Sequence, residues 1–134
     1  MGEIDLYKAF DKIYLDALFI KLMKRQIPNK LLIILENWLC GSCACVKLNN
    51  LWSDMFTINF GVRQGSVLSP VLFAIYIDDV SKCSKLYPRS YVILYADDIL
   101  LLSPTVTLLD ILFAACEFEL THLDMAINSK KSCV

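Results

Sequence analysis

The sequence lacks an apolar segment long enough to cross a membrane. A membrane-spanning helix needs about 18 to 20 consecutive apolar residues, whereas the longest run, over 67–77, contains Ser69 and Pro70 and ends at Asp78-Asp79. The N-terminus also lacks the basic segment and the apolar core of a secretory signal peptide. We therefore expect an intracellular protein, nuclear or cytoplasmic, that is not secreted and has no membrane span.

An excess of basic residues is also missing. The chain has 13 Lys and Arg residues against 14 Asp and Glu residues, which leaves a net charge of -1. Nucleic-acid-binding domains usually carry a basic face. Charge alone therefore argues against tight binding of a polyanion by this chain.

Histidine occurs once, as His122, although the sequence has six cysteines. Cys40, Cys43 and Cys45 have spacings that suit metal ligands, but a structural zinc site needs four ligands, usually with a second close pair. The remaining cysteines are Cys83, Cys116 and Cys133. Because an intracellular compartment is reducing, we expect buried or half-buried thiols that form neither a zinc site nor a disulfide.

Apolar residues are abundant, at 57% of the chain with a mean hydropathy of +0.53. Ordinary soluble domains have about 45 to 50%, and 134 residues are enough for one domain with a real core. We therefore expect a single domain over 1–134 that leaves apolar surface uncovered. That surface would touch a membrane, pack against further domains or form an oligomer.

The first half of the chain predicts a strand, two helices and a hairpin. A short strand over 4–6 precedes apolar residues at helical spacing, and this first helix stops before Pro28. A second helix is expected from Asn29, as its N-cap, to the terminating Gly41. Strand-like residues over 44–60 then predict a hairpin.

The second half predicts a loop, two helices and another hairpin. Gly61 and Gly65 bracket the loop, and Ser69 is the expected cap of a helix with Pro70 in its first turn. An apolar stripe of helical period over 108–123 predicts the last helix. Because strands and helices interleave, the predicted fold class is α+β, with an antiparallel sheet backed by helices.

The pair Asp97-Asp98 stands between two short apolar runs, 91–95 and 99–102. This pattern predicts a β-hairpin with both acids at its turn. Adjacent carboxylates repel each other, and burying either without a partner is costly, so the pair indicates a cation site. Magnesium fits, because it takes one or two carboxylates and fills its other positions with water and phosphate oxygens. A second pair, Asp78-Asp79, has only the pattern of a solvated helix end.

Three segments together form a known pattern: 5–11 (DLYKAFD), 61–70 (GVRQGSVLSP) and 95–98 (YADD). In this order and at this separation they resemble the palm motifs of reverse transcriptases, most closely those of non-LTR (LINE-type) retrotransposons. The resemblance covers nearly the whole chain. It implies a polymerase palm with RNA-directed DNA polymerase activity, whose partners are an RNA template, a DNA primer and dNTP.

The resemblance also implies a catalytic metal site. Asp5 and Asp97 would bridge two Mg²⁺ ions, or Mn²⁺ in their place, and Asp98 would be the supporting catalytic and metal-binding acid. Polymerases hold two such ions about 3.5 to 4 Å apart, where they activate the 3'-hydroxyl and hold the triphosphate. Because Asp5 lies far before Asp97 in the chain, the site requires the first strand to lie beside the hairpin.

Several implied residues would contact substrates. Phe10 stands where reverse transcriptases have an aromatic that excludes a 2'-hydroxyl, although a core aromatic fits the same pattern. Gln64 and Gly65 match the loop that contacts dNTP and template, where glycine allows close approach of the backbone. Arg63 replaces a common proline, and its guanidinium would either reach phosphate or be solvated. Tyr95 belongs to the acidic motif and is expected to contact substrate.

Two further positions match the family less specifically. Lys131, three residues after Asn128, stands where the family has a lysine near the incoming triphosphate, but Lys130 is an equal candidate and either fits an ordinary surface charge. Asp11 belongs to the family string and has the pattern of a cap for the helix that follows.

The chain also departs from the family pattern. We expect the fingers and thumb to be missing, the strand with Asp5 to be frayed or truncated, and activity of the chain alone to be weak or absent. Missing domains would explain both the apolar surface and the low basic charge. The alternatives are a non-catalytic palm remnant acting as an interaction module, a decayed retroelement product without a stable fold, and an RNA-dependent RNA polymerase palm. Ala96, where RNA-dependent RNA polymerases usually have glycine, and Phe10 favour DNA synthesis.

Overall fold

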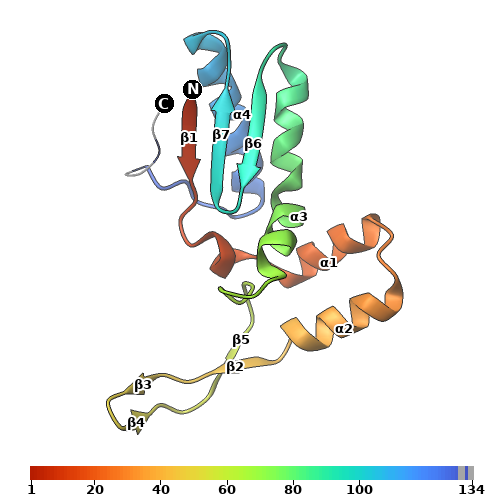
Figure 1. The fold of residues 1–134 in the computed structure, drawn as a ribbon, viewed down its shortest axis with the longest axis vertical. Helices are drawn as coiled ribbons and strands as arrows, with labels where there is room; N and C mark the ends of the chain where they lie inside the picture. The colour runs from red at the N-terminus through yellow and green to blue at the C-terminus, as the bar shows by residue number, and fades with distance from the viewer. Residues whose placement is uncertain (130–131, 133–134) are drawn as a thin grey trace.

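A three-stranded antiparallel sheet is the centre of the fold (Figure 1). The computed structural model describes residues 1–129 and 132. The strands lie side by side in the order β1 (Gly2–Asp5), β7 (Asp98–Leu102) and β6 (Tyr91–Tyr95). The first strand of the chain therefore pairs with the second strand of the predicted hairpin. The strand that carries Asp5 is short, as predicted, but it begins at Gly2 rather than at Ile4.

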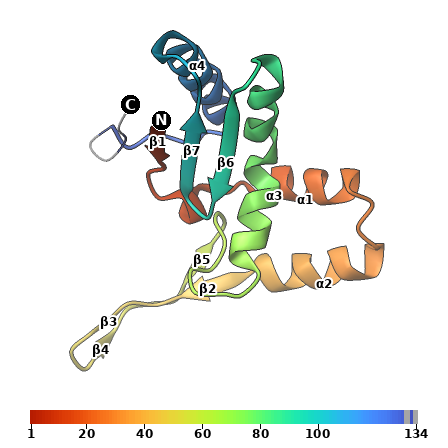
Figure 2. The same ribbon diagram turned by 45° about the horizontal axis from the view of Figure 1, so that its top comes forward.

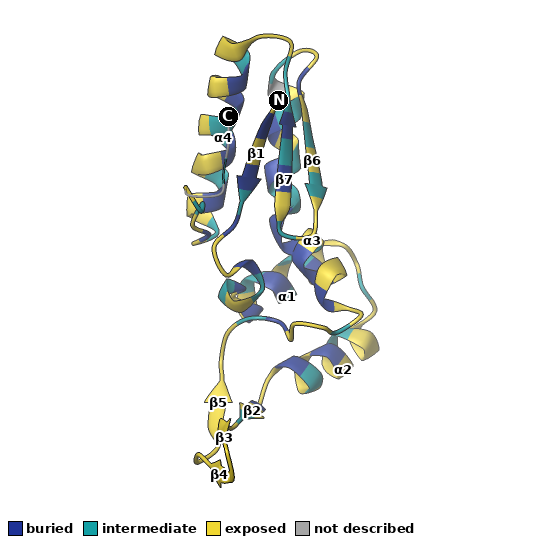
Figure 3. Ribbon diagram, turned by 60° about the vertical axis from the view of Figure 1, so that its left-hand side comes forward, coloured by how far each residue is buried: buried dark blue, intermediate teal, exposed yellow. Residues whose placement is uncertain are grey.

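Two helices, α3 (Ser69–Ser81) and α4 (Val106–His122), pack against one face of this sheet (Figures 1 and 2). Ile4, Ile99 and Leu101 alternate with outward-facing residues along β1 and β7, and all three are fully buried. Figure 3 shows the buried residues gathered between the sheet and its helices. The period-2 alternation of the strands thus meets the apolar sides of the helices, which confirms the predicted α+β class with a helix-backed antiparallel sheet.

Of the two covering helices, α3 begins differently from the prediction. Ser69 is the first helical residue of α3 rather than its N-cap; Leu68 occupies that position, and the Ser69 hydroxyl donates a hydrogen bond to the Arg63 carbonyl at 2.6 Å. The last helix, predicted from the apolar stripe over 108–123, is confirmed as α4, and the Thr105 hydroxyl caps it by accepting from the Leu108 N–H at 3.3 Å.

Two further helices, α1 (Leu15–Lys24) and α2 (Asn29–Leu39), form a helical hairpin beyond one end of the sheet, where α1 packs against α3 (Figure 1). Both predicted helices are confirmed: the first was predicted from apolar spacing and the second from the residues at its ends. The expected N-cap role of Asn29 is wrong, because Pro28 holds that position and no side chain caps the helix. Gly41 follows α2 with φ +77°, a conformation that suits the end of a helix.

Short 3-10 helices connect these parts. The first, η1 (Ala9–Lys12), follows β1 and contains Asp11. The predicted role of Asp11 as a helix cap is therefore wrong, since Tyr14 is the residue before α1. The second, η2 (Lys82–Leu86), continues from α3.

An extended arm over 42–58 projects away from the sheet (Figure 2). Its inner strands β2 (Ser42–Ala44) and β5 (Phe56–Ile58) pair, as do its outer strands β3 (Lys47–Leu48) and β4 (Leu51–Trp52), so the predicted hairpin is confirmed. The exposed apolar side chains of the arm include Val46, Leu48, Leu51, Trp52, Met55 and Phe56. The expected uncovered apolar surface is therefore present.

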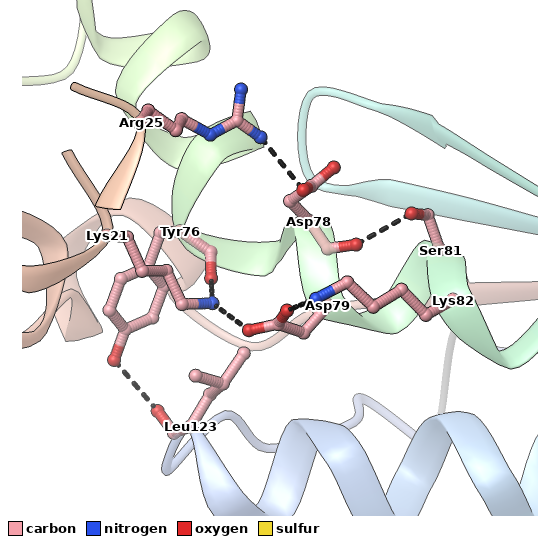
Figure 4. A network of polar contacts seen from close by, with 8 residues as sticks. All are labelled: Lys21, Arg25, Tyr76, Asp78, Asp79, Ser81, Lys82 and Leu123. Atoms are coloured by element: carbon pink, nitrogen blue, oxygen red, sulfur yellow. Dashed lines mark hydrogen bonds and ion pairs between the residues drawn. The ribbon is translucent and has the colours of Figure 1, made fainter. Parts of the chain in front are cut away.

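The second acidic pair joins two helices. Asp79 on α3 lies 2.8 Å from the Lys21 ammonium of α1 and also pairs with Lys82, while Asp78 lies 2.8 Å from the guanidinium of Arg25, the residue that follows α1 (Figure 4). The hydrogen bonds from Lys21 and Lys82 lower the pKa of Asp79 to about 2. Asp78-Asp79 thus lies near the end of α3 and is partly exposed to solvent, as predicted, whereas its ion pairs with Lys21 and Arg25 were not predicted.

The cysteines divide into two groups. Cys40, Cys43 and Cys45 are exposed, so the expectation of buried or half-buried thiols is wrong for them, because they lie at the end of α2 and along the open arm. Cys83 and Cys116 are buried, and burial raises the pKa of the Cys116 thiol to about 12. Both stay protonated and unreactive at neutral pH. Cys133 lies outside the described residues.

Within residues 1–129 and 132, no helix combines the length and apolarity needed to cross a membrane.

Candidate active site

The acidic residues meet at one end of the central sheet. Asp5 is the last residue of β1 and Asp98 is the first of β7, and their Cα atoms are direct partners in the antiparallel register. Direct partners in an antiparallel pair direct their side chains to the same face, with Cβ atoms about 4.5 to 5.5 Å apart. The prediction that the first strand lies beside the acidic hairpin is therefore confirmed.

The hairpin turn differs from the prediction by one residue. Ala96 and Asp97 form the two-residue turn, whereas Asp98 already belongs to β7 and pairs with Tyr95. Ala96 has φ 49°, the left-handed conformation that two-residue hairpin turns require and that usually selects glycine or asparagine. The turn thus separates the two adjacent acids: Asp98 lies on the sheet face, and Asp97 lies at the tip.

One face of the sheet remains free of helices at this end. Tyr95, Asp98 and Asp5 form a row across its three strands, because Asp98 pairs with both of the others. Tyr95 is 79% exposed. The row therefore places an aromatic ring and two carboxylates on an accessible surface.

Asp97 borders a cavity of about 380 Å³ that brings the three sequence segments together. The cavity is lined by Phe10, Gln64, Gly65, Ser66, Val67, Ser69, Pro70 and Asp97. The Phe10 ring also packs against Phe73, with ring centroids 5.0 Å apart. Both interpretations of Phe10 are thus compatible with its position, since one side of the ring contacts a core residue while the residue borders the cavity.

Backbone hydrogen bonds hold the loop 61–65 against η1. The Gly61 N–H donates to the Ile13 carbonyl at 2.8 Å, and the Val62 N–H donates to the Phe10 carbonyl at 2.9 Å. A Cβ atom at Gly61 would lie only 2.8 Å from the Phe10 carbonyl oxygen, so this close approach requires glycine. The Gln64 amide completes the contact by donating to Asp11 Oδ1 at 3.2 Å.

Arg63 lines a second cavity beside this loop. Its guanidinium donates to the hydroxyl of Ser42 at 3.2 Å, and both residues line this cavity of about 380 Å³ with Asp11, Phe60 and Gln64. Arg63 does not line the cavity that contains Asp97. The sequence left open whether Arg63 binds phosphate or is solvated. The structure gives its guanidinium a third kind of partner, the Ser42 hydroxyl of the same chain.

The C-terminal segment holds Asp5 in place, and sequence reasoning missed this contact. The Asn128 side-chain amide donates to Asp5 Oδ2 at 2.8 Å, and its backbone N–H donates to the Asp5 carbonyl at 2.9 Å. The Ser132 hydroxyl accepts from the Asp5 N–H at 3.2 Å. The one feature of the sequence that could have indicated this contact is the asparagine at position 128. Lys130 and Lys131, the predicted triphosphate-contacting candidates, lie outside the described residues.

The acids supply oxygen ligands, although the described part of the chain contains no group of three His, Cys, Asp or Glu side chains that could hold a metal ion. Mg²⁺ does not require such a group, because it binds through one or two carboxylates and completes its coordination with water and substrate phosphates. The paired positions of Asp5 and Asp98, with Asp97 in the adjacent turn, fit that requirement.

The sequence model of the family described as reverse transcriptase (RNA-dependent DNA polymerase) matches residues 1–134.

Three similar proteins come from Drosophila melanogaster. The chain is 35% identical over 104 residues to a probable RNA-directed DNA polymerase from transposon BS, covering 74% of this chain and 11% of that protein. It is 31% identical over 97 residues to a probable RNA-directed DNA polymerase from transposon X-element, covering 72% and 11%. It is 31% identical over 77 residues to the RNA-directed DNA polymerase from mobile element jockey, covering 58% and 8%. The chain thus spans about a tenth of the length of these relatives.

Proposed function

The chain belongs to the reverse transcriptase family, and we propose that it forms the catalytic palm of an RNA-directed DNA polymerase of a non-LTR retrotransposon. In this proposal the domain transfers a nucleotide from dNTP to the 3'-hydroxyl of a DNA primer paired with an RNA template. The observation that carries the proposal is the register of β1 on β7, which sets Asp5 opposite Asp98 beside the turn that holds Asp97. No local feature of the sequence requires that pairing.

Reverse transcriptases use divalent metal ions, and Asp5, Asp97 and Asp98 are the residues that would hold them here. Two bound Mg²⁺ ions, or Mn²⁺, would neutralise charge on the phosphates and lower the pKa of the attacking 3'-hydroxyl. Asp5 and Asp98 present their carboxylates on the helix-free face of the sheet, while Asp97 borders the cavity. The chain contributes positioning: the sheet sets the separation of the carboxylates before substrate arrives.

The cavity beside Asp97 supports a nucleotide site. Phe10 on one wall would exclude a 2'-hydroxyl by its bulk, and its contact with Phe73 restricts the movement of the ring. Gln64 and Gly65 on another wall would contact the base and sugar of the dNTP. Tyr95 on the open sheet face would contact the primer strand, and Lys131 would neutralise the triphosphate.

Arg63 has a different place in this proposal. It bonds to Ser42 and lines the second cavity, not the cavity that Asp97 borders. It would contact template phosphate rather than the triphosphate. The proposed partners are therefore RNA template, DNA primer and dNTP, all at one end of the sheet.

Cation binding by the isolated chain tests the proposal. Addition of MnCl2 at millimolar concentration should broaden the backbone NMR resonances of Asp5, Asp97 and Asp98, because a paramagnetic ion relaxes nearby nuclei. Asp97→Asn removes a carboxylate charge and should weaken binding at least about tenfold. Asp110→Asn, an exposed acid on α4, is the matched control and should leave binding unchanged.

Two outcomes would separate the alternatives. If Mn²⁺ and Mg²⁺ leave all three aspartate resonances unchanged at millimolar concentration, the chain is a non-catalytic palm remnant and the metal proposal is wrong. If the chain binds the ions, its extension of a primed RNA template with Mg²⁺ and dNTP, lost in Asp97→Asn, would establish the polymerase activity.

A further inference from the structure

We propose that Asn128 is a positioning residue that orients the Asp5 carboxylate for cation binding. The inference rests on the proposed polymerase function, because it assigns a supporting residue to the same metal site. Asn128 Nδ2 lies 2.8 Å from Asp5 Oδ2, a distance typical of a hydrogen bond to a charged carboxylate. The two residues are separated by 123 positions in the chain, so only the tertiary fold brings them together.

The backbone around Asn128 is itself fixed to β1 and the residues that follow it. The Asn128 N–H donates to the Asp5 carbonyl at 2.9 Å, Ile127 forms an isolated bridge with Leu6, and the Tyr7 N–H donates to the Ala126 carbonyl at 2.8 Å. The amide of Asn128 therefore extends from a backbone that is attached to the same strand as its carboxylate partner. This attachment limits the directions in which the Asp5 carboxylate can turn.

Ser132 closes the arrangement from the other side. Its hydroxyl accepts from the Asp5 N–H at 3.2 Å and donates to the Asn128 carbonyl at 2.9 Å, and its own N–H also donates to that carbonyl at 2.9 Å. The backbone N–H, the backbone carbonyl and the side-chain carboxylate of Asp5 thus all bond to Asn128 or Ser132.

Asp5 differs in this respect from the other two acids. Among the described residues, no side chain or backbone group forms a hydrogen bond or ion pair with the carboxylate of Asp97 or Asp98. An amide suits position 128, because it donates to a carboxylate without adding charge, whereas an acid there would repel Asp5. Hydrogen-bond partners of metal-binding carboxylates fix the ligand orientation, and their loss typically costs about 10- to 100-fold in metal affinity.

The test compares cation affinity with thermal stability in Asn128→Ala. We expect Mn²⁺ affinity of the full chain, measured by NMR line broadening and isothermal titration, to fall about 10- to 100-fold. The broadening at Asp5 should decrease more than the broadening at Asp98, which a general loss of stability would not produce. Ser129→Ala changes an exposed neighbour in the same segment and should leave the affinity unchanged.

If Asn128→Ala fails to fold, as judged by circular dichroism, Asn128→Ser decides the question, because it keeps a polar side chain whose hydroxyl is too short to replace the amide. It should show the same loss of affinity. Unchanged Mn²⁺ affinity in a folded variant, with binding by the wild-type chain, would overturn the positioning role alone. No binding by the wild-type chain would overturn this role together with the proposed polymerase function.

Discussion

Two glycines in the loop 61–65 have the same backbone conformation and different surroundings. Gly61 and Gly65 both have φ +82°, a backbone conformation that residues other than glycine rarely adopt. A Cβ atom on Gly65 would meet nothing within 4 Å, whereas one on Gly61 would lie 2.9 Å from the Asp11 Cα atom. Gly61 thus controls how closely the loop approaches η1 and the cavity beside Asp97.

We expect Gly61→Ala to destabilise the chain more than Gly65→Ala. In both variants an alanine in the left-handed conformation should lower the free energy of unfolding by about 1 to 2 kcal/mol. Gly61→Ala adds a clash with rigid backbone, which should cost about 1 to 3 kcal/mol more. Urea unfolding of both variants measures the difference, and equal losses would show that the loop moves away from η1 without cost.

Ion pairs join the C-terminal end of α1 to α3. Lys21 of α1 and Arg25, the residue that follows this helix, reach Asp79 and Asp78 on α3. The side chain of Asp79 is 39% exposed, so solvent screens its pairs and their contribution to stability is modest. The apolar contacts between the helices and the sheet, rather than these pairs, provide most of the stability.

The lowered pKa of Asp79 predicts a dependence of stability on pH. Because its pKa is about 2 in the folded chain and 3.8 in the reference state, the stabilisation is complete above pH 3.8 and is lost as the pH falls through 2. Asp79→Asn should therefore lower the free energy of unfolding at pH 6 by about 1 kcal/mol or less, with a smaller difference near pH 2. Chemical unfolding at several pH values measures this, with Asp110→Asn as the control; a difference independent of pH would contradict the assignment.

The whole molecule divides into a packed region and an exposed arm. Phe73 and Tyr76 of α3 are almost fully buried beneath the sheet, whereas Trp52 on the arm is 64% exposed. The arm therefore adds apolar surface without adding core. That this surface packs against fingers, a thumb or another chain is a prediction.

Substitutions in these two regions should have very different effects. Phe73→Ala leaves a cavity in the core and should cost about 3 to 5 kcal/mol of unfolding free energy. Trp52→Ser removes an exposed ring and should change stability by less than about 0.5 kcal/mol. Thermal and urea unfolding measure both, and a large loss in Trp52→Ser would mean that the arm is part of the cooperative core.

The sequence alone was sufficient for local structure and for the family. The spacing of apolar residues predicted α1, Asn29 and Gly41 predicted α2 between them, and the apolar runs around Asp97 predicted the hairpin. Residue types at short spacing determine such features, because helix periodicity and turn conformation depend on neighbours in the chain. Exact caps were less predictable, as Asn29 and Ser69 illustrate, because a polar side chain near a helix start has several backbone partners within reach.

The tertiary structure alone decided which acids are neighbours and what holds them. The register places Asp5 opposite Asp98 rather than Asp97, and the fold brings Asn128 to Asp5 and Lys21 to Asp79. These contacts join distant parts of the chain, and they depend on how strands align and helices pack over the whole domain. Local sequence patterns carry no information on that alignment, so the family motif identified the acids while the sheet set their geometry.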